Sequence, residues 1–495
     1  MGNEAVEAYL PEEVVQPLLS SANASSVREA LEALIETSRT AAGRSGLASK
    51  NILAVVLRLT RELWQHPQRQ VLVLSLKFLR NLCAGEVVNQ DLFVEQNGVK
   101  VILEVLRTEV ESSVPNSGII RMGLQVLANV SLAGEKHQSS MWMQCFPNEF
   151  LDLARVRSRE TIDPLCMIVY ACSDGNDAFM AELCGEDGLG LVAEIVRTVS
   201  AVGFGEMWFK LLLSRICLEG PHLPSLFSKL CTAPAPSNTE EDVTVKDDTF
   251  SPEQAYLLSI VAEILNERLE EVRVSADIAS FVFEVYERSV GLVEFHSRRK
   301  CGLPTGVANI DVLGYSLTIL RDVCAQDGLG DADDSVQTAV LALLSRGLLD
   351  FLLDLLRDLE PPAIVRKAIK HVENEEGRAS VGSKVCPYGG FRRDLVAVIA
   401  NCSFRRRHVQ DEIREKGGIP LLLQQCVTDE DNPFLREWGL WAIRNLLLDN
   451  PKNQQEVSDL KLEGSVDVPE VAELGLRVEL DPRTGRPKLV NCPRP

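Results

Sequence analysis

Apolar residues recur every three or four positions along most of this chain, which is the spacing of one buried face on an α-helix. In residues 336–357 they follow this spacing closely, and charged residues share the remaining face. The strict alternation that marks a strand is nearly absent until the end of the chain. There, residues 478–480 and 488–490 flank a turn-forming segment and predict a small β-hairpin. We therefore expect an all-α fold with a short C-terminal hairpin.

A second pattern repeats at longer range. Four segments carry an apolar residue, a variable residue and an asparagine, with a glutamine nine positions after the asparagine. The asparagines are Asn81, Asn129, Asn401 and Asn445, and they lie 48 residues apart in the first pair and 44 apart in the second. A period of about 40–47 residues with two or three helices is typical of armadillo and HEAT repeats. The sequence therefore predicts an armadillo/HEAT-like α-solenoid of about nine or ten units.

The repeat signature weakens in the middle of the chain. Gly98 and Gly418 each lie 17 residues after their asparagine. The same offset from Gly188 places Ala171 in the asparagine position of one further unit. Asp322 is a candidate for that position in another unit.

Changes in composition divide the chain into segments. Two stretches lack helical spacing and are expected to be linkers, because they are rich in acidic residues, Pro, Gly or Ser. The expected segments are N-terminal repeats at 1–232, an acidic linker at 233–250, middle helical repeats at 251–371, a second linker at 372–390, C-terminal repeats at 391–462, and a tail with the hairpin at 463–495.

Several stretches of this sequence resemble the ataxin-10 family. GGIPLLLQQC (417–426), DEDNPFLREW (429–438) and WAIRNLLLDNPKNQ (441–454) look like its C-terminal domain, and FLRNLCAGEVVNQ (78–90) and LANVSLAGEKHQSSMWMQCFPNEF (127–150) match nearer the start. The resemblance implies a cytoplasmic armadillo-repeat protein that self-associates through its C-terminal region. It also implies a role in cytokinesis and cell survival through protein partners.

The charge balance and the absence of known motifs argue against several classes of function. The chain carries 51 Lys and Arg against 71 Asp and Glu, a formal net charge of −20. This balance argues against nucleic acid as a partner, because a phosphate backbone is bound by Lys and Arg. The sequence contains no run of 18 apolar residues, so it predicts no membrane span. The six histidines lie at least 37 residues apart, and no nucleophile elbow or phosphate loop occurs. We expect no enzyme activity, no cofactor and no metal site.

The repeated asparagines are the leading candidates for a binding site. Asparagine is a modest helix former, so its recurrence needs a reason. Each amide either bonds a neighbouring repeat or joins a ladder that grips the backbone of an extended peptide. Trp441, Arg444 and Asn445 favour the second interpretation locally, because the tryptophan lies one turn before the asparagine.

Two further candidates are local. Arg405, Arg406 and Arg407 form a basic run that is either a solvated loop or a patch for an acidic partner. Ser251 precedes Pro252, which fits both a helix N-cap and a proline-directed phosphorylation site.

These features favour a non-catalytic cytoplasmic scaffold that acts through protein surfaces. One alternative is a peptide-binding cargo adaptor of the nuclear import receptor type. Such adaptors pair Trp with Asn in most repeats, whereas Lys77, Gln125 and Ala397 occupy the Trp position in the other three repeats here. A third class is a metal-handling protein, since some fungal relatives carry a copper-transport label. Copper sites use clustered Cys and Met ligands, and this chain has no Cys-x-x-Cys motif.

Overall fold

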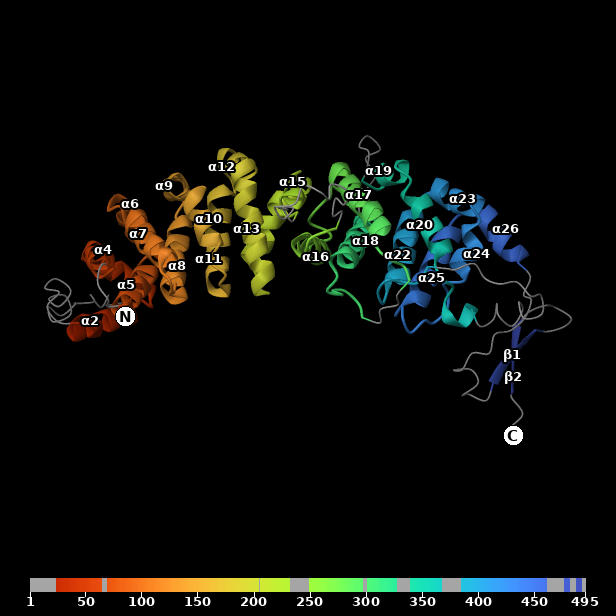
Figure 1. Cartoon of the computed structure of the whole chain (residues 1–495), viewed down its shortest axis with the longest axis horizontal. Coiled ribbons are helices and arrows are strands. Elements are labelled where there is room, and N and C mark those ends of the chain that lie inside the picture. The colour runs from red at the N-terminus through yellow and green to blue at the C-terminus, as the bar shows by residue number, and fades with distance from the viewer. Residues whose placement is uncertain are drawn as a thin grey trace, which may run out of the picture. The chain divides into compact units, whose positions relative to one another are not determined.

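The computed structural model describes residues 24–64, 69–203, 205–231, 249–296, 301–326, 339–366, 384–460, 476–480 and 487–491. The chain divides into two compact units, unit 1 (residues 1–233) and unit 2 (residues 234–495). Both units are helical, and the strands of unit 2 form one hairpin (Figure 1). This confirms the predicted all-α solenoid with a short C-terminal hairpin.

Unit 1 is built around a row of stacked helices. Its elements are α2 (Ala24–Thr37), α3 (Ala41–Ala48), α4 (Ile52–Leu63), α5 (Arg69–Leu82), α6 (Val87–Glu95), α7 (Gly98–Glu111), α8 (Ser117–Ser131), α9 (Glu135–Cys145), α10 (Asn148–Ala154), α11 (Arg159–Ser173), α12 (Asp177–Leu183), α13 (Glu186–Val202), α14 (Met207–Leu213), the π-helical turn η1 (Ser214–Leu218) and α15 (Leu223–Lys229). Helices α2, α5, α8, α11 and α14 pack in succession and form the row. The helices between them in sequence cover the other side of this row (Figure 1).

Unit 2 repeats this arrangement. Its elements are α16 (Pro252–Glu267), α17 (Ala276–Leu292), α18 (Ala308–Gln326), α19 (Ala339–Ser345), α20 (Leu348–Asp358), α22 (Phe391–Ser403), α23 (Arg407–Glu415), α24 (Gly418–Leu423), α25 (Leu435–Leu447), α26 (Pro451–Asp459), β1 (Leu476–Leu480) and β2 (Pro487–Asn491). Helices α16, α18, α22 and α25 form the row. The two strands pair antiparallel, with Val478 opposite Leu489.

Row helices are apolar on nearly every side because neighbours cover both flanks. In α8, Leu124, Leu127 and Val130 are completely buried. Burying one such side chain contributes about 1.5–3 kcal/mol, so the stacking of repeats supplies the main stabilisation of each unit.

The glycines of the repeat signature have a steric role. Each lies in the first turn of a helix that begins close to the helix before it. A Cβ on Gly98 would lie 2.6 Å from the ring of Phe93, and one on Gly418 would lie 2.6 Å from Cγ2 of Ile413. Gly188 is equally confined by the backbone of Leu183, which supports the assignment of a repeat to this region.

The amphipathic segment 336–357 is interrupted in the structure. Helix α19 ends at Ser345 and α20 begins at Leu348, because Gly347 adopts a left-handed conformation with φ of 90°. The spacing of apolar residues continues through this turn, which is why the sequence alone predicts no break. Residues 336–338 lie outside the described residues, as do 233–248 of the first linker and 372–383 of the second.

Candidate protein-interaction surfaces

The side-chain amide of each repeat asparagine bonds the repeat before it. The Nδ2 atoms donate as follows: Asn129 to the carbonyl of Arg80 (2.8 Å), Asn401 to the carbonyl of Arg321 (3.0 Å), Asn445 to the carbonyl of Ala400 (2.9 Å), and Asn81 to Oγ of Ser38 (3.1 Å). Each carbonyl belongs to the residue just before the asparagine position of the preceding row helix. By this geometry Asp322 occupies that position in α18.

Two of the four glutamines of the signature, Gln90 and Gln410, extend this network to the following repeat. Nε2 of Gln90 donates to the carbonyl of Cys83 in its own repeat and to that of Asn129 in the next, at 2.9 and 2.8 Å. Gln410 likewise reaches the carbonyl of Asn445 at 2.9 Å. Gln454, in the last repeat, bonds the carbonyl of Leu447. The spacing of nine residues therefore places one amide where two consecutive row helices end.

These bonds are those that the structural interpretation of the asparagines requires. Asn81, Asn129 and Asn401 remain partly exposed, whereas Asn445 is completely buried. The Oδ1 atom of Asn445 has no hydrogen-bond partner. Peptide binding by this ladder stays a prediction, and it would have to use amides whose donors already hold the repeats together.

Asp322 gives the row of unit 2 a buried charged cluster. Arg321 lies 2.8 Å from the Asp322 carboxylate and 3.9 Å from that of Asp394. The Tyr388 hydroxyl donates to Asp394 at 3.1 Å. Burial raises the pKa of both carboxyl groups, and the adjacent arginines oppose that rise. Sequence spacing gave no signal for this cluster, because its members come from α18, α22 and the loop before α22.

The last row helix of unit 2 exposes apolar side chains. Leu440 is 55% exposed and Trp441 is 47% exposed, and the Arg444 guanidinium lies 4.7 Å from the Trp441 ring centroid. The position of Leu440 is held in earlier repeats by Leu76, Leu124 and Val396, and all three are completely buried. We call Leu440, Trp441 and Arg444 the α25 end face. The sequence indicated Trp441 and Arg444 but not Leu440.

The basic run does not form one patch. Arg406 donates to the carbonyls of Asn401 and Cys402, at 3.1 and 3.3 Å, where α22 ends. Arg405 has a positive φ of 56° and stacks over Phe404. Arg407 pairs with Asp411 at 3.4 Å. Arg405 and Arg407 are exposed, and Arg406 is half-buried. Binding of an acidic partner by this run stays a prediction.

Ser251 is an N-cap with both bonds of a capping box. Its hydroxyl accepts from the Gln254 backbone N–H at 3.1 Å, and the Gln254 side chain accepts from the Ser251 N–H at 3.0 Å. Ser251 is 2% exposed. Phosphorylation at this residue stays a prediction, and it would require the first turn of α16 to open.

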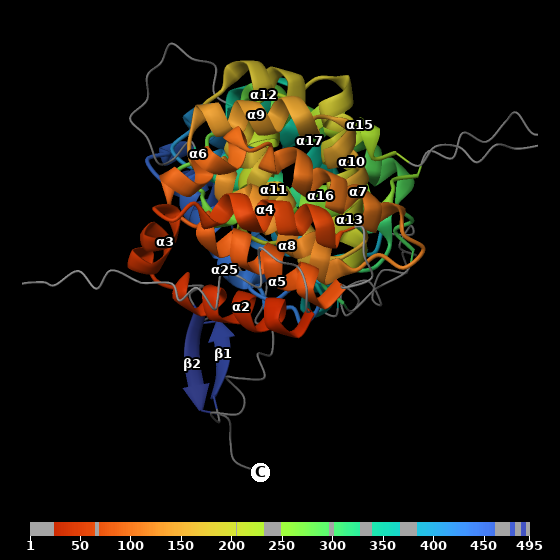
Figure 2. The ribbon, with the colours of Figure 1, turned by 90° about the vertical axis from the view of Figure 1, so that its left-hand side faces the viewer.

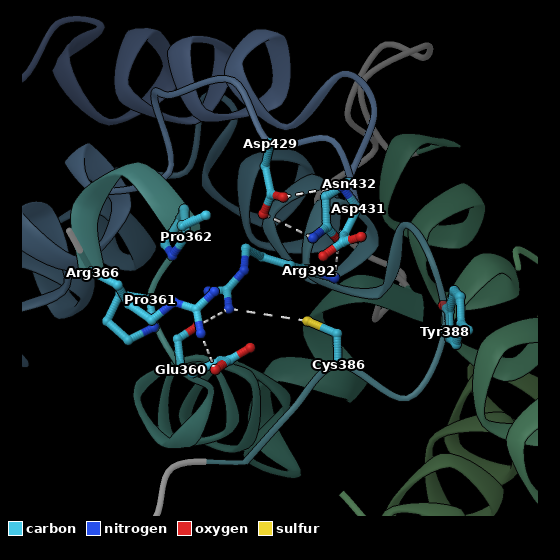
Figure 3. Close-up of a pocket in the computed structure, with 11 residues that line it drawn as sticks. Glu360, Pro361, Pro362, Arg366, Cys386, Tyr388, Arg392, Asp429, Asp431 and Asn432 are labelled. Carbon is cyan, nitrogen blue, oxygen red and sulfur yellow. Dashed lines mark hydrogen bonds and ion pairs between the residues drawn. The ribbon is translucent and has the colours of Figure 1, made fainter. Parts of the chain in front are cut away.

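A small cavity lies beside the start of α22, around the buried side chain of Arg392 (Figure 3). The guanidinium donates to the carbonyl of Glu360 and lies 4.0 Å from Sγ of Cys386. Burial raises the pKa of the Cys386 thiol, and the neighbouring Arg392 charge opposes this rise. Asn432 accepts from the Arg392 backbone N–H at 3.0 Å. The cavity volume of about 20 Å³ suits one water molecule and leaves no room for a larger ligand. The role of these contacts is therefore to hold the neighbouring loops against α22.

In the part of the chain that the structure describes, no three His, Cys, Asp or Glu side chains converge in a way that would hold a metal ion. Within the same ranges, no helix has the length and apolar character needed to cross a bilayer.

In each unit, a row of stacked helices is held together by hydrogen bonds from side-chain amides, which join one repeat to the next. This arrangement defines an armadillo-type α-solenoid. A family model described as the spinocerebellar ataxia type 10 protein domain matches residues 391–490. Ataxin-10 of Homo sapiens and of Pongo abelii are each 25% identical over 421 residues, which cover 83% of this chain and 80% of theirs. The ataxin-10 homolog of Dictyostelium discoideum is 41% identical over 105 residues, 21% of this chain and 17% of that protein. These matches support membership of the ataxin-10 family, as the resemblance predicted.

Proposed function

We propose that this protein is a non-catalytic cytoplasmic scaffold that binds other proteins, including a second copy of itself, through solenoid surfaces. The observation that carries the proposal is the α25 end face. Leu440 is exposed at a position that other repeats bury completely. Exposed apolar residues at the open end of a solenoid mark a surface that is covered by another element or another chain.

A second copy is the partner that this surface favours. The name of the family model that matches residues 391–490 refers to homo-association, and the α25 end face lies inside that range. A two-fold contact would place the apolar residues of one α25 against those of another. Trp and Arg are also the residues that most often dominate binding energy at protein interfaces.

A biological role in cytokinesis or cell survival is part of the proposal and rests on the family resemblance. The cargo-adaptor alternative is less favoured. It needs an accessible asparagine beside Trp441, whereas Asn445 is buried and bonded to the preceding repeat.

Light scattering on the full chain tests the proposal. The Leu440→Glu substitution should lower the mass of the wild-type oligomer toward the 54.6 kDa of one chain. Because Leu440 is exposed in the single chain, its substitution should leave the helical content of each chain unchanged. Val114→Glu is the matched control, since Val114 is 73% exposed and lies in unit 1.

Two results would contradict the proposal. A wild-type chain that is monomeric at all concentrations would exclude self-association. An oligomer whose mass is the same in wild type, Leu440→Glu and Val114→Glu would exclude the α25 end face as its interface.

A further inference from the structure

Unit 1 contains a cluster of cations that the repeat pattern does not indicate. An open depression of about 420 Å³ lies between α2, α3 and α5. Its lining includes Arg39, Arg44, Lys77 and Arg80, and no acidic residue. We call these four residues the basic depression. Figure 2 shows α2 and α3 beside α5 at the start of unit 1. In a chain with a net charge of −20, such a grouping needs a reason.

Among the residues that the structure describes, three of these cations have no carboxylate partner. Arg44 donates to the carbonyls of Ser38 and Arg39, both at 3.3 Å. Arg80 donates to Oδ1 of Asn81 and to Oε1 of Gln125, at 2.9 and 3.1 Å. All of these acceptors are neutral, so they orient the guanidinium groups without cancelling their charge.

Within the described ranges, neither Arg44, Lys77 nor Arg80 forms an ion pair. The fourth cation, Arg39, pairs with Glu36 at 3.2 Å, but both side chains are more than 60% exposed. Surface pairs of this kind contribute little and exchange readily. The positive charge of the depression is therefore available to a ligand.

The surroundings of Arg80 strengthen this conclusion. Partial burial and the nearby charge of Arg121 lower the pKa of Arg80, so its charge is held in an unfavourable setting. An anion in the depression would relieve both effects, because it would replace lost hydration and offset the neighbouring cation. Both arginines lie on row helices, α5 and α8.

We propose that the basic depression binds an extended acidic segment of a partner protein. Arg44 lies on α3, whereas Lys77 and Arg80 lie one helical turn apart on α5. An extended chain rises about 3.3 Å per residue and places every second side chain on the same face, so Asp or Glu at alternate positions can meet successive cations. A guanidinium binds a carboxylate through two parallel hydrogen bonds, which gives the site direction as well as charge.

A protein ligand fits the charges better than a nucleic acid. Nucleic-acid sites typically neutralise about 6–10 phosphates along a basic stripe. Here the cations are gathered in one depression on an acidic chain, whose overall charge repels a long polyanion. A short acidic segment experiences mainly the local positive field, since screening limits interactions to about 8–10 Å at physiological salt.

Fluorescence anisotropy on the full chain tests the proposal. The probe is a labelled peptide of alternating Glu and Ser, with the corresponding Gln and Ser peptide as the neutral probe. Lys77→Glu should weaken binding of the acidic peptide about tenfold or more, because it replaces attraction by like-charge repulsion. Lys77 makes no ion pair, so the melting temperature should not change. Arg44→Gln should weaken binding less, because it removes one charge without reversing it.

Lys100→Glu is the matched control, since Lys100 is exposed on α7 and makes the same change of charge outside the depression. It should alter binding by less than about twofold, because Lys100 does not line the depression and salt screens exposed charges. An equal loss in Lys77→Glu and Lys100→Glu, or equal binding of the acidic and neutral peptides, would overturn the proposal. A single-stranded oligonucleotide that binds as tightly as the acidic peptide would also overturn it, in favour of a general polyanion site. None of these outcomes depends on the oligomer mass that tests the α25 end face.

Discussion

Asn445 donates its side-chain amide to the main-chain carbonyl of Ala400, which lies 2.9 Å away and 45 residues earlier in the chain. Both residues are completely buried, so the bond is shielded from water. It ties α25 to α22 at the position where other asparagines tie their own row helices together. The asparagine is thus part of the joint between two repeats.

Replacing Asn445 with alanine should therefore destabilise the protein. The substitution removes a buried hydrogen bond and leaves a void, and we expect a loss of about 1–3 kcal/mol. Trp441→Ala is the comparison, because its side chain is 47% exposed and should affect stability by less than about 0.5 kcal/mol. Urea unfolding of the two single variants measures both effects. Equal stability of Asn445→Ala and wild type would show that the bond does not hold α25 in place.

Gly439 should tolerate no side chain. It is buried in α25, and a Cβ at this position would lie 2.6 Å from the carbonyl oxygen of Gln425. Because that oxygen belongs to the backbone, relief requires a shift of α25, and Gly439→Ala should cost about 1–3 kcal/mol. Gly291→Ala is the control, since Gly291 is exposed in α17 and a Cβ there meets nothing within 4 Å. The control should be neutral or stabilising by up to about 1 kcal/mol, measured by thermal unfolding.

Asp411 makes stability depend on pH in the acidic range. Hydrogen bonds from Asn450 and then Arg414 lower the pKa of its carboxyl group from 3.8 to about 2. A carboxyl group whose pKa is lower in the folded state stabilises the fold above its unfolded pKa. That stabilisation disappears as the pH falls from 3.8 to about 2.

The Asp411→Asn substitution should accordingly lower the melting temperature at neutral pH. The difference from wild type should shrink as the pH falls through this window, because the wild-type carboxyl group becomes neutral. Melting curves recorded from neutral pH to about pH 2 measure this. A difference that is constant with pH would mean that the charge of Asp411 contributes nothing.

The capping box of α16 gives a prediction for Ser251. Ser251→Ala removes the bond to the Gln254 N–H and should cost about 1 kcal/mol. Because the hydroxyl is buried, a proline-directed kinase should modify a short peptide of this sequence much faster than it modifies the native chain. Equal rates on peptide and native chain would show that the first turn of α16 opens readily.

The parts of the molecule that follow the repeat period were predictable from the sequence. The asparagine and glutamine positions, the helical spacing and the hairpin each depend on local pattern or on one regular offset. The hydrogen-bond acceptor of each asparagine side chain was not predictable, because that acceptor lies in another repeat. The break at Gly347 within 336–357 was not predictable either, because a single left-handed residue leaves the apolar spacing on both sides of it intact.

Adjacency in the sequence was a poor guide to the charged surfaces. Arg405, Arg406 and Arg407 are consecutive, yet they stack on a ring, cap a helix and pair with an acid respectively. Arg44 and Arg80, by contrast, lie on separate helices and yet line the same depression. They meet because α3 packs against α5, a contact that no local pattern in the sequence indicates.

In the repeats of α5 and α22, the asparagine bonds the repeat before it and the glutamine bonds the repeat after it. A tandem copy that carries both residues would therefore satisfy the joints on its two sides, whereas a partial copy would break two at once. Gene duplication could lengthen such an array by whole modules without redesign of the neighbours. The amide network makes the repeat, rather than the helix, the unit that can be added or removed with the bonds between repeats preserved.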